Sequence, residues 1–221
     1  MKNILKFAGV LVLLTVMYSC SNIKVLASWK GENVNDIKDN KIIVIARTDN
    51  NQARIAFESE IANKLKENGM NATTSFSVLP TKVKIGEGIT EEQKVAFRNF
   101  LNTEGYDGIV LSVIKDEQET TKTYSDGGYY AGATVPFYPG YYNGFYSYYY
   151  NPMAYSSFGT YVEPSSTTYT YKTYVLETVA YDLNQKDGKQ LVAVVTTKIE
   201  NPQDISRNAQ EYTKKIAKAL K

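Results

Sequence analysis

The sequence predicts an α/β (α+β) fold, a mixed sheet of five to six strands packed with about three helices. Three observations predict it. Short runs of β-branched apolar residues alternate with amphipathic helical segments in the first half of the chain. Two segments of period-two alternation follow a long loop rich in tyrosine and glycine, and a capped amphipathic segment comes last. The expected order is β-α-β-α-β, the long loop, then β-β-α, which is typical of helices packed on a mixed sheet.

The first predicted β-α-β unit begins with a continuous apolar run, KIIVIA, at 41–46. Such a run is typical of a strand that is buried on both faces. Asp49 and Gln52 resemble a capping box for the helix that follows, and Gly69 stands where a C-terminal cap is expected. Residues 71–78 are predicted to form the second strand.

A second helix and a third strand come next. Thr90 and Gln93 form another capping-box pair, and Gly105 marks the end of this helix. The segment DGIVLSVIK at 107–115 is apolar at its centre, and an alternating polar stretch continues from it to residue 124. We therefore expect a third strand that extends outward as a polar ribbon.

The last elements are a hairpin and a helix. Residues 168–182 and 190–199 alternate with period two around a turn that contains Asp187-Gly188, so the sheet is expected to become antiparallel here. Asn201 is the expected cap of the final helix, with Pro202 at its first position. The apolar stripe of this helix comprises Ile205, Ala209, Tyr212, Ile216 and Leu220.

The first residues have the pattern of an export signal. Lys2 and Lys6 precede an uncharged apolar run of eleven residues at 7–17, which is too short to span a bilayer as a helix. Ser19 and Cys20 follow directly. A cysteine in this place is typical of a bacterial lipoprotein, in which cleavage precedes the cysteine and acyl chains are attached to it. The alternatives are a signal peptide with an incidental cysteine and an uncleaved anchor.

These signals divide the chain into three parts. Residues 1–19 are the expected lipoprotein signal peptide, and 20–40 the expected lipidated N-terminus and tether, in which 23–29 alternates weakly like an edge strand. Residues 41–221 are expected to form a single α/β domain, with the tyrosine- and glycine-rich insertion at about 125–167. The sole tryptophan, within the tether, is expected to pack, with a surface contact as the alternative.

Charge and composition exclude several functions. Loss of Lys2 and Lys6 with the signal peptide leaves equal numbers of basic and acidic residues, so there is no basic footprint for nucleic acid. Histidine is absent and Cys20 is the only cysteine, which excludes Ser-His-Asp triads, Cys-His pairs and nearly all zinc catalysis. We expect no cofactor, no metal site and no enzyme activity. Carboxylate pairs, Ser-Lys dyads and oxygen-ligand metal sites are the chemistries that stay open.

Acidic side chains are weak catalytic candidates. Glu58 and Glu60 lie two apart on a helix and face different directions, so they are not a catalytic pair. Asp116, Glu117 and Glu119 carry oxygen ligands for a divalent cation, but the lysines on either side favour a solvated strand edge.

Arg47 and Arg54 have the best positional argument for a small-molecule site. Arg47 ends a central strand and Arg54 lies in the next helix, at the edge where open α/β sheets bind ligands. The alternative for both is a salt bridge or a helix cap.

The insertion has an unusual composition. Residues 127–162 carry no charged side chain, and they include eleven tyrosines, six glycines and three prolines. One interpretation is a contact surface, because tyrosine offers apolar area and a hydroxyl at low entropic cost and its ring stacks on sugars. The other is a low-complexity excursion from one end of the sheet. The candidate contact residues are Tyr129, Tyr130, Tyr141, Tyr142, Tyr148, Tyr149 and Tyr150.

Several segments together suggest a relationship to known proteins: Ser19-Cys20-Ser21, SWK at 28–30, KIIVIART at 41–48, YDGIVLSV at 106–113, the insertion, and ETVAYDL to QLVAVVTT within 177–197. On these segments the chain resembles a family of small lipoproteins of unknown function in Gram-negative envelopes. The resemblance implies residence in the cell envelope and brings no catalytic residues. At the level of fold alone, the pattern is similar to the N-terminal domain of TolB and to curli-secretion lipoproteins.

Together these observations favour a membrane-anchored envelope lipoprotein that acts by non-catalytic contact with a protein or glycan. The alternatives are a ligand-binding or enzymatic domain that uses the strand ends near Arg47, and a purely structural envelope component. The membrane partner is reached through the acyl chains on Cys20. Because no aspartate follows Cys20 directly, the expected location is the outer membrane, facing the periplasm.

Overall fold

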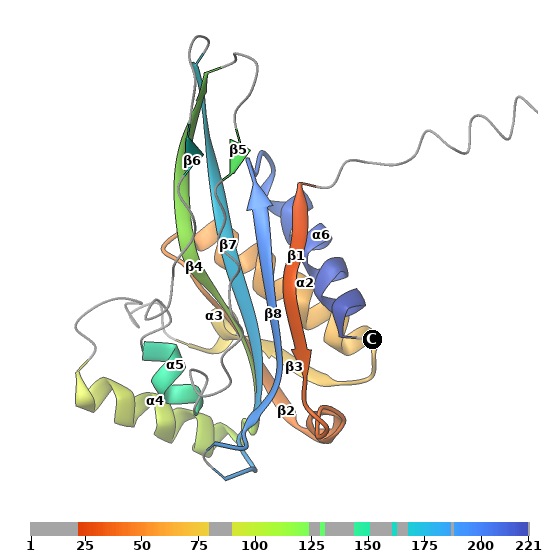
Figure 1. Cartoon of the computed structure of the whole chain (residues 1–221). Coiled ribbons are helices and arrows are strands. Elements are labelled where there is room, and N and C mark those ends of the chain that lie inside the picture. Colours follow the sequence, from red (N-terminus) through yellow and green to blue (C-terminus); the bar gives the residue numbers. More distant parts are fainter. Residues whose placement is uncertain are drawn as a thin grey trace, which may run out of the picture.

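The computed structural model describes residues 22–79, 90–123, 129–130, 144–150, 161–162, 168–186 and 188–220. Its centre is a mixed sheet in the order β1-β8-β7-β4-β2-β3 (Figure 1), which confirms the predicted α+β class. The strands of this sheet are β1 (Ile23–Lys30), β2 (Lys41–Arg47), β3 (Asn71–Thr74), β4 (Gly108–Thr123), β7 (Thr168–Asp182) and β8 (Leu191–Glu200). The strand β2 is parallel to β3 and β4, and the other pairings are antiparallel.

Helices cover both faces of the sheet. In Figure 1, α2 and α6 lie behind it, and α4 and α5 lie in front. A second sheet pairs β5 (Tyr129–Tyr130) with β6 (Tyr161–Val162). The helices are η2 (Asp36–Asp39), α2 (Asn51–Glu67), α3 (Ser75–Val78), α4 (Glu91–Glu104), α5 (Phe145–Tyr150) and α6 (Ile205–Ala219).

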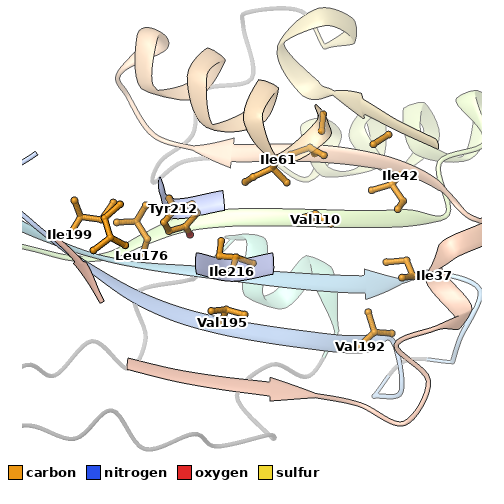
Figure 2. Close-up of a cluster of buried hydrophobic side chains, with 14 residues drawn as sticks. Ile37, Ile42, Ile61, Val110, Leu176, Val192, Val195, Ile199, Tyr212 and Ile216 are labelled. Atoms are coloured by element: carbon orange, nitrogen blue, oxygen red, sulfur yellow. The ribbon is translucent and has the colours of Figure 1, made fainter. Parts of the chain in front are cut away.

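The strand β2 is apolar along its whole centre because both of its faces are covered. Residues 42–46 are all buried. Ile42 and Val44 point to the side of α2 and α6, where they join the cluster drawn in Figure 2 with Tyr212 and Ile216 of α6. Ile43 and Ile45 point to the opposite side and join Phe97 and Leu101 of α4. Two layers of core therefore meet at this strand, as the unbroken run predicted.

Two details of the first β-α-β unit differ from the prediction. The cap of α2 is Asn50, whose side chain accepts from the Ala53 amide at 3.0 Å, rather than Asp49. The second strand ends at Thr74, and Ser75–Val78 turns into α3. The strand ends early because of a contact with another element. The Phe76 amide donates to the buried Glu58 carboxylate at 2.8 Å, and this bond holds the chain away from the sheet.

The second helix has the predicted ends. Thr90 and Gln93 form a reciprocal capping box at the start of α4, and Gly105 ends it with φ at +69°. That left-handed conformation is strained for residues with a Cβ atom, which explains the glycine.

The final helix begins later than predicted. Its cap is Asp204, which accepts from the Arg207 amide at 2.9 Å, and not Asn201. Asn201 has φ at +48°, whereas a capping residue usually has extended backbone. The predicted stripe is confirmed, since Ala209, Tyr212 and Ile216 are buried.

The domain begins before the predicted boundary at residue 41. The weak edge strand is confirmed as β1, which pairs antiparallel with β8. Trp29 packs against the core on the side of α4 and α5, as expected for its packing role. The residues 22–40 are therefore folded into the domain and do not form a tether.

The insertion contributes to the core, which its composition did not predict. Phe145 of α5 is fully buried, with its ring 6.2 Å from that of Phe97 and 5.7 Å from that of Tyr181. Tyr149 lies one helical turn further on and is also buried, stacked on Phe97 at 5.3 Å. The spacing of four residues puts both rings on one face of α5. The predicted structureless loop is therefore interrupted by a helix that docks on the sheet.

Replacing Phe145 with alanine tests this docking. We expect Phe145→Ala to lower the free energy of unfolding by about 3–5 kcal/mol, because it removes a fully buried ring and leaves a cavity. Urea unfolding of the soluble domain measures the change. Val95→Ala on α4 is the control, since Val95 is 52 % exposed and its truncation should cost less than about 0.5 kcal/mol. Equal effects of the two changes would contradict the docking of α5.

Candidate functional site

Polar side chains converge at the carboxyl end of β2, where the sequence predicts a ligand. We call Arg47, Arg54, Glu58, Ser75 and Tyr149 the strand-end cluster. The Glu58 side chain is its centre and is fully buried. One carboxylate oxygen accepts from the Ala46 amide at 3.0 Å, the Arg54 Nε at 3.0 Å and the Ser75 hydroxyl at 2.6 Å, and the other accepts from the Phe76 amide. Glu58 thus joins β2, α2 and α3.

Arg54 completes this arrangement from one turn earlier on α2. Its Nε pairs with Glu58 and its second terminal nitrogen donates to the Ser75 hydroxyl at 2.8 Å. These contacts are those of a buried salt bridge, which was one of the two predicted roles of Arg54. Sequence reasoning considered Glu58 only as a catalytic partner of Glu60 and missed its ion pair with Arg54, although a spacing of four residues is that of a helical ion pair.

Arg47 and Tyr149 bring together two features that the sequence predicted separately. The Arg47 guanidinium donates to the Tyr149 carbonyl oxygen, and its carbon lies 5.6 Å from the centroid of the Tyr149 ring. Burial raises the pKa of the Tyr149 hydroxyl, against the opposing effect of the nearby Arg47 and Arg54 charges. Since Arg47 is thereby engaged by α5, a ligand at this strand end stays a prediction, and the contacts favour a structural role.

A second polar group lies further along the sheet, on the face that carries the Arg47 side chain. Lys115 and Glu177 are both buried with 3.6 Å between the amine and a carboxylate oxygen, and the Thr196 hydroxyl donates to Glu177 at 3.3 Å. Burial lowers the pKa of Lys115, and the Glu177 charge opposes this effect. Lys115 lies where the pairing of β4 with β7 is irregular, between Ile114 and Asp116. This irregularity explains why its side chain contacts Glu177.

The opposite face of the sheet, on which α6 packs, carries a row of hydrogen-bonded hydroxyl groups. The Ser112 and Thr178 oxygens are 2.7 Å apart, and Thr178 is 2.6 Å from the Tyr212 hydroxyl of α6. The Tyr212 ring contacts Phe57 of α2 with 5.1 Å between centroids. This chain fixes the position of α6 on the sheet and satisfies a tyrosine that is fully buried.

The acidic residues of β4 do not converge. Glu117 pairs with Lys172 of the neighbouring strand at 2.6 Å, and Asp116 accepts from the Gln118 amide at 2.8 Å. Among the residues that the structure describes, no three acidic, cysteine or histidine side chains are grouped closely enough to hold a metal ion.

A hollow of about 210 Å³ lies where α6 begins. Asn22 reaches into this region and donates to the Glu200 carbonyl at 3.0 Å and to the Asn208 side chain at 3.1 Å. Arg207 and Glu211 on the rim are paired at 3.3 Å. The residues that line the hollow are Asn22, Gln203, Asp204, Arg207, Asn208 and Glu211.

Comparisons with known proteins assign no family. No family model matches the sequence, and no curated protein matches it. The fold is similar to that of PelC from Paraburkholderia phytofirmans, a dodecamer, with 12 % identity over 90 % of this chain and 96 % of that chain and a TM-score of 0.44. A point variant of the same dodecamer has 10 % identity, the same coverage and a TM-score of 0.41. These values carry no argument about function.

The remaining predicted residues are located only in part. Tyr129 and Tyr130 form β5, and Tyr148 and Tyr150 belong to α5. Tyr141, Tyr142, Ser19 and Cys20 lie outside the described residues. Within the described ranges, no helix is long and apolar enough to cross a membrane.

The strand-end cluster can be tested by removing its centre. We expect Glu58→Ala to lower the free energy of unfolding by about 3–5 kcal/mol, because it leaves the Arg54 charge and several buried donors without their acceptor. Chemical denaturation measures the change.

Glu60→Ala is the matched control in the same helix. Glu60 is only half-buried, so its truncation should change the stability by less than about 0.5 kcal/mol. A Glu58→Ala protein as stable as the control would show that the cluster does not hold β2, α2 and α3 together.

Proposed function

We propose that this chain is a lipid-anchored protein of the cell envelope that acts by non-catalytic contact with a protein or glycan. One observation carries the proposal. The lipoprotein pattern ends at Cys20, and Asn22, two residues later, is already bound to the domain. The candidate anchor is therefore only two residues in sequence from the folded body, which begins at the end of the sheet where β1 starts. A triacylated cysteine there holds the domain at a membrane without a spanning helix.

The proposed location is the outer membrane, with the domain in the periplasm. Ser21 follows Cys20, so the chain lacks the aspartate that favours retention in the inner membrane. The near-neutral charge of the exported chain leaves the acyl chains as the means of attachment.

The state of the buried polar groups supports contact over catalysis. Glu58 and Arg54 bind each other and backbone amides, and Lys115 pairs with Glu177. A catalytic carboxylate or amine needs free hydrogen-bonding capacity directed at a substrate. The hydrogen-bonding capacity of these groups is used within the fold, where they join its elements.

The insertion is the proposed contact element. Its helix α5 is fastened to the sheet by Phe145 and Tyr149, and seven of its eleven tyrosines lie outside α5 on uncharged stretches of sequence. Tyrosine supplies contact area with only two side-chain torsions to order, and its ring stacks on sugars.

Cys20→Ala tests the anchor. We expect the variant to appear in the soluble envelope fraction, because it has no site for acyl chains, and to lose incorporation of a clickable palmitate analogue. Ser21→Ala is the control and should remain in the membrane fraction. A Cys20→Ala protein that stays in the membrane would overturn the lipid anchor.

Tyrosine-to-serine changes outside α5 test the contact. Deleting the whole insertion is uninformative, because it removes the buried Phe145 and Tyr149. We expect combined serine changes at Tyr129, Tyr130, Tyr141 and Tyr142 to abolish partner crosslinks in intact cells while the melting temperature stays within about 2 °C.

Tyr174→Ser outside the insertion is the control for that experiment. Tyr174 is half-buried on β7, and its hydroxyl lies 3.5 Å from Glu117. Crosslinks to proteins and retention on isolated cell wall are the two readouts. Unchanged crosslinks and retention in the four-tyrosine variant would contradict the insertion as the contact element.

A further inference from the structure

We propose that the distal part of the β4–β7 hairpin lies against the lipid surface to which the chain is anchored. This part, which we call the ribbon, comprises residues 118–123 of β4 and 168–173 of β7. The inference rests on the proposed acylation of Cys20. It adds to that proposal the orientation of the domain and a second membrane contact.

The direction in which the chain leaves the domain is set by Asn22. Its carbonyl accepts from the Glu200 amide at 2.9 Å, and its side chain donates to the Glu200 carbonyl and to Asn208. These bonds continue the pairing of β1 with β8 by one residue. Only Ser21 separates this fixed residue from Cys20, so the connection to the anchor is one residue long.

The ribbon extends from the same end of the sheet. Ile23 is level with Ile199, Ile199 with Tyr174, and Tyr174 with Glu117. Beyond this level β4 and β7 continue as a pair for six more residues each. At the rise of a strand, the ribbon protrudes by about 20 Å past the start of β1. Figure 1 shows this protrusion above the first residue of β1.

The anchor is too short to clear the ribbon. Cys20 lies three residues ahead of Ile23 and so reaches at most about 10 Å past it. With the strands upright, the ribbon would extend about 10 Å deeper than the anchored cysteine. The polar layer of one leaflet is only about 5–8 Å thick. The ribbon therefore meets the headgroups and reaches the hydrocarbon boundary, unless the sheet tilts.

The composition of the ribbon suits headgroups and opposes deeper insertion. Its twelve residues include six threonines, two tyrosines, two lysines and one glutamate. Charged side chains are costly in the hydrocarbon core, whereas tyrosines favour the membrane–water interface. Since β7 lies two strands, or about 10 Å, from β1, a tilt of the sheet by about 45° brings the tip of the ribbon to the depth of Cys20, where it contacts the headgroups.

Depth-dependent quenching tests the orientation in the lipidated, full mature protein. The protein is reconstituted into vesicles of phosphatidylethanolamine and phosphatidylglycerol that contain nitroxide-labelled lipids. A fluorophore is attached to one introduced cysteine, which is the only free thiol because Cys20 is acylated. The three positions are Thr121→Cys on the ribbon, Leu26→Cys on the exposed edge of β1, and Lys189→Cys in the turn before β8, all exposed.

The expected result is loss of most of the fluorescence at position 121 and little loss at positions 26 and 189. A spacer of ten glycine and serine residues between Ser21 and Asn22 has a root-mean-square span of about 17 Å. Because it lets the domain move away, we expect it to restore the fluorescence at position 121.

Three outcomes overturn the inference. The first is fluorescence at position 121 as bright as at position 189. The second is quenching at position 26 in place of position 121. The third is quenching at position 121 that survives the spacer, which would mean that the short connection does not position the ribbon. Failure of the anchor itself is recognised separately, because the protein would then not float with the vesicles.

Discussion

Burial of both faces of the central strands is the constraint on which the rest of this structure depends. An apolar layer is needed on each side of β2, β4 and β7, since an exposed face of this size would be unstable in water. The helices α2 and α6 supply one layer. On the other side α4 covers only part of the sheet, and Phe145 and Tyr149 of α5 complete it. The helix α5 of the tyrosine-rich insertion is therefore part of the folded domain, and the insertion is also the proposed contact element.

Buried polar groups determine how the layers fit together. Hydrophobic burial is non-directional, whereas the Glu58 carboxylate requires donors from β2, α2 and α3 in one geometry. The Ser112–Thr178–Tyr212 chain does the same for α6. Breaking such a group is costly because its partners stay buried without bonds.

The position of the first strand links the fold to the proposed anchor. Because β1 starts at Ile23 and Asn22 is held by β8 and α6, the domain begins almost at the candidate acylation site. If Cys20 carries the proposed acyl chains, a connection of this length limits how far the domain can move from the membrane. In the proposed orientation, the β4–β7 pair extends further toward the membrane surface than this connection does.

Local patterns in the sequence were enough to predict the α+β class, the order of the main strands along the chain, and the caps at Thr90 and Gly105. These features depend on periodicity and on the backbone conformation of residues close together in the chain. The position of Arg47 and Arg54 after a central strand, and the composition of the insertion, also identified these arginines and the tyrosines as candidates. Tertiary structure alone decided that the second strand ends at Thr74, that the domain begins at residue 22 and not at 41, and that Arg47 meets Tyr149. These features arise from contacts between residues far apart in sequence, for which no local pattern carries the signal.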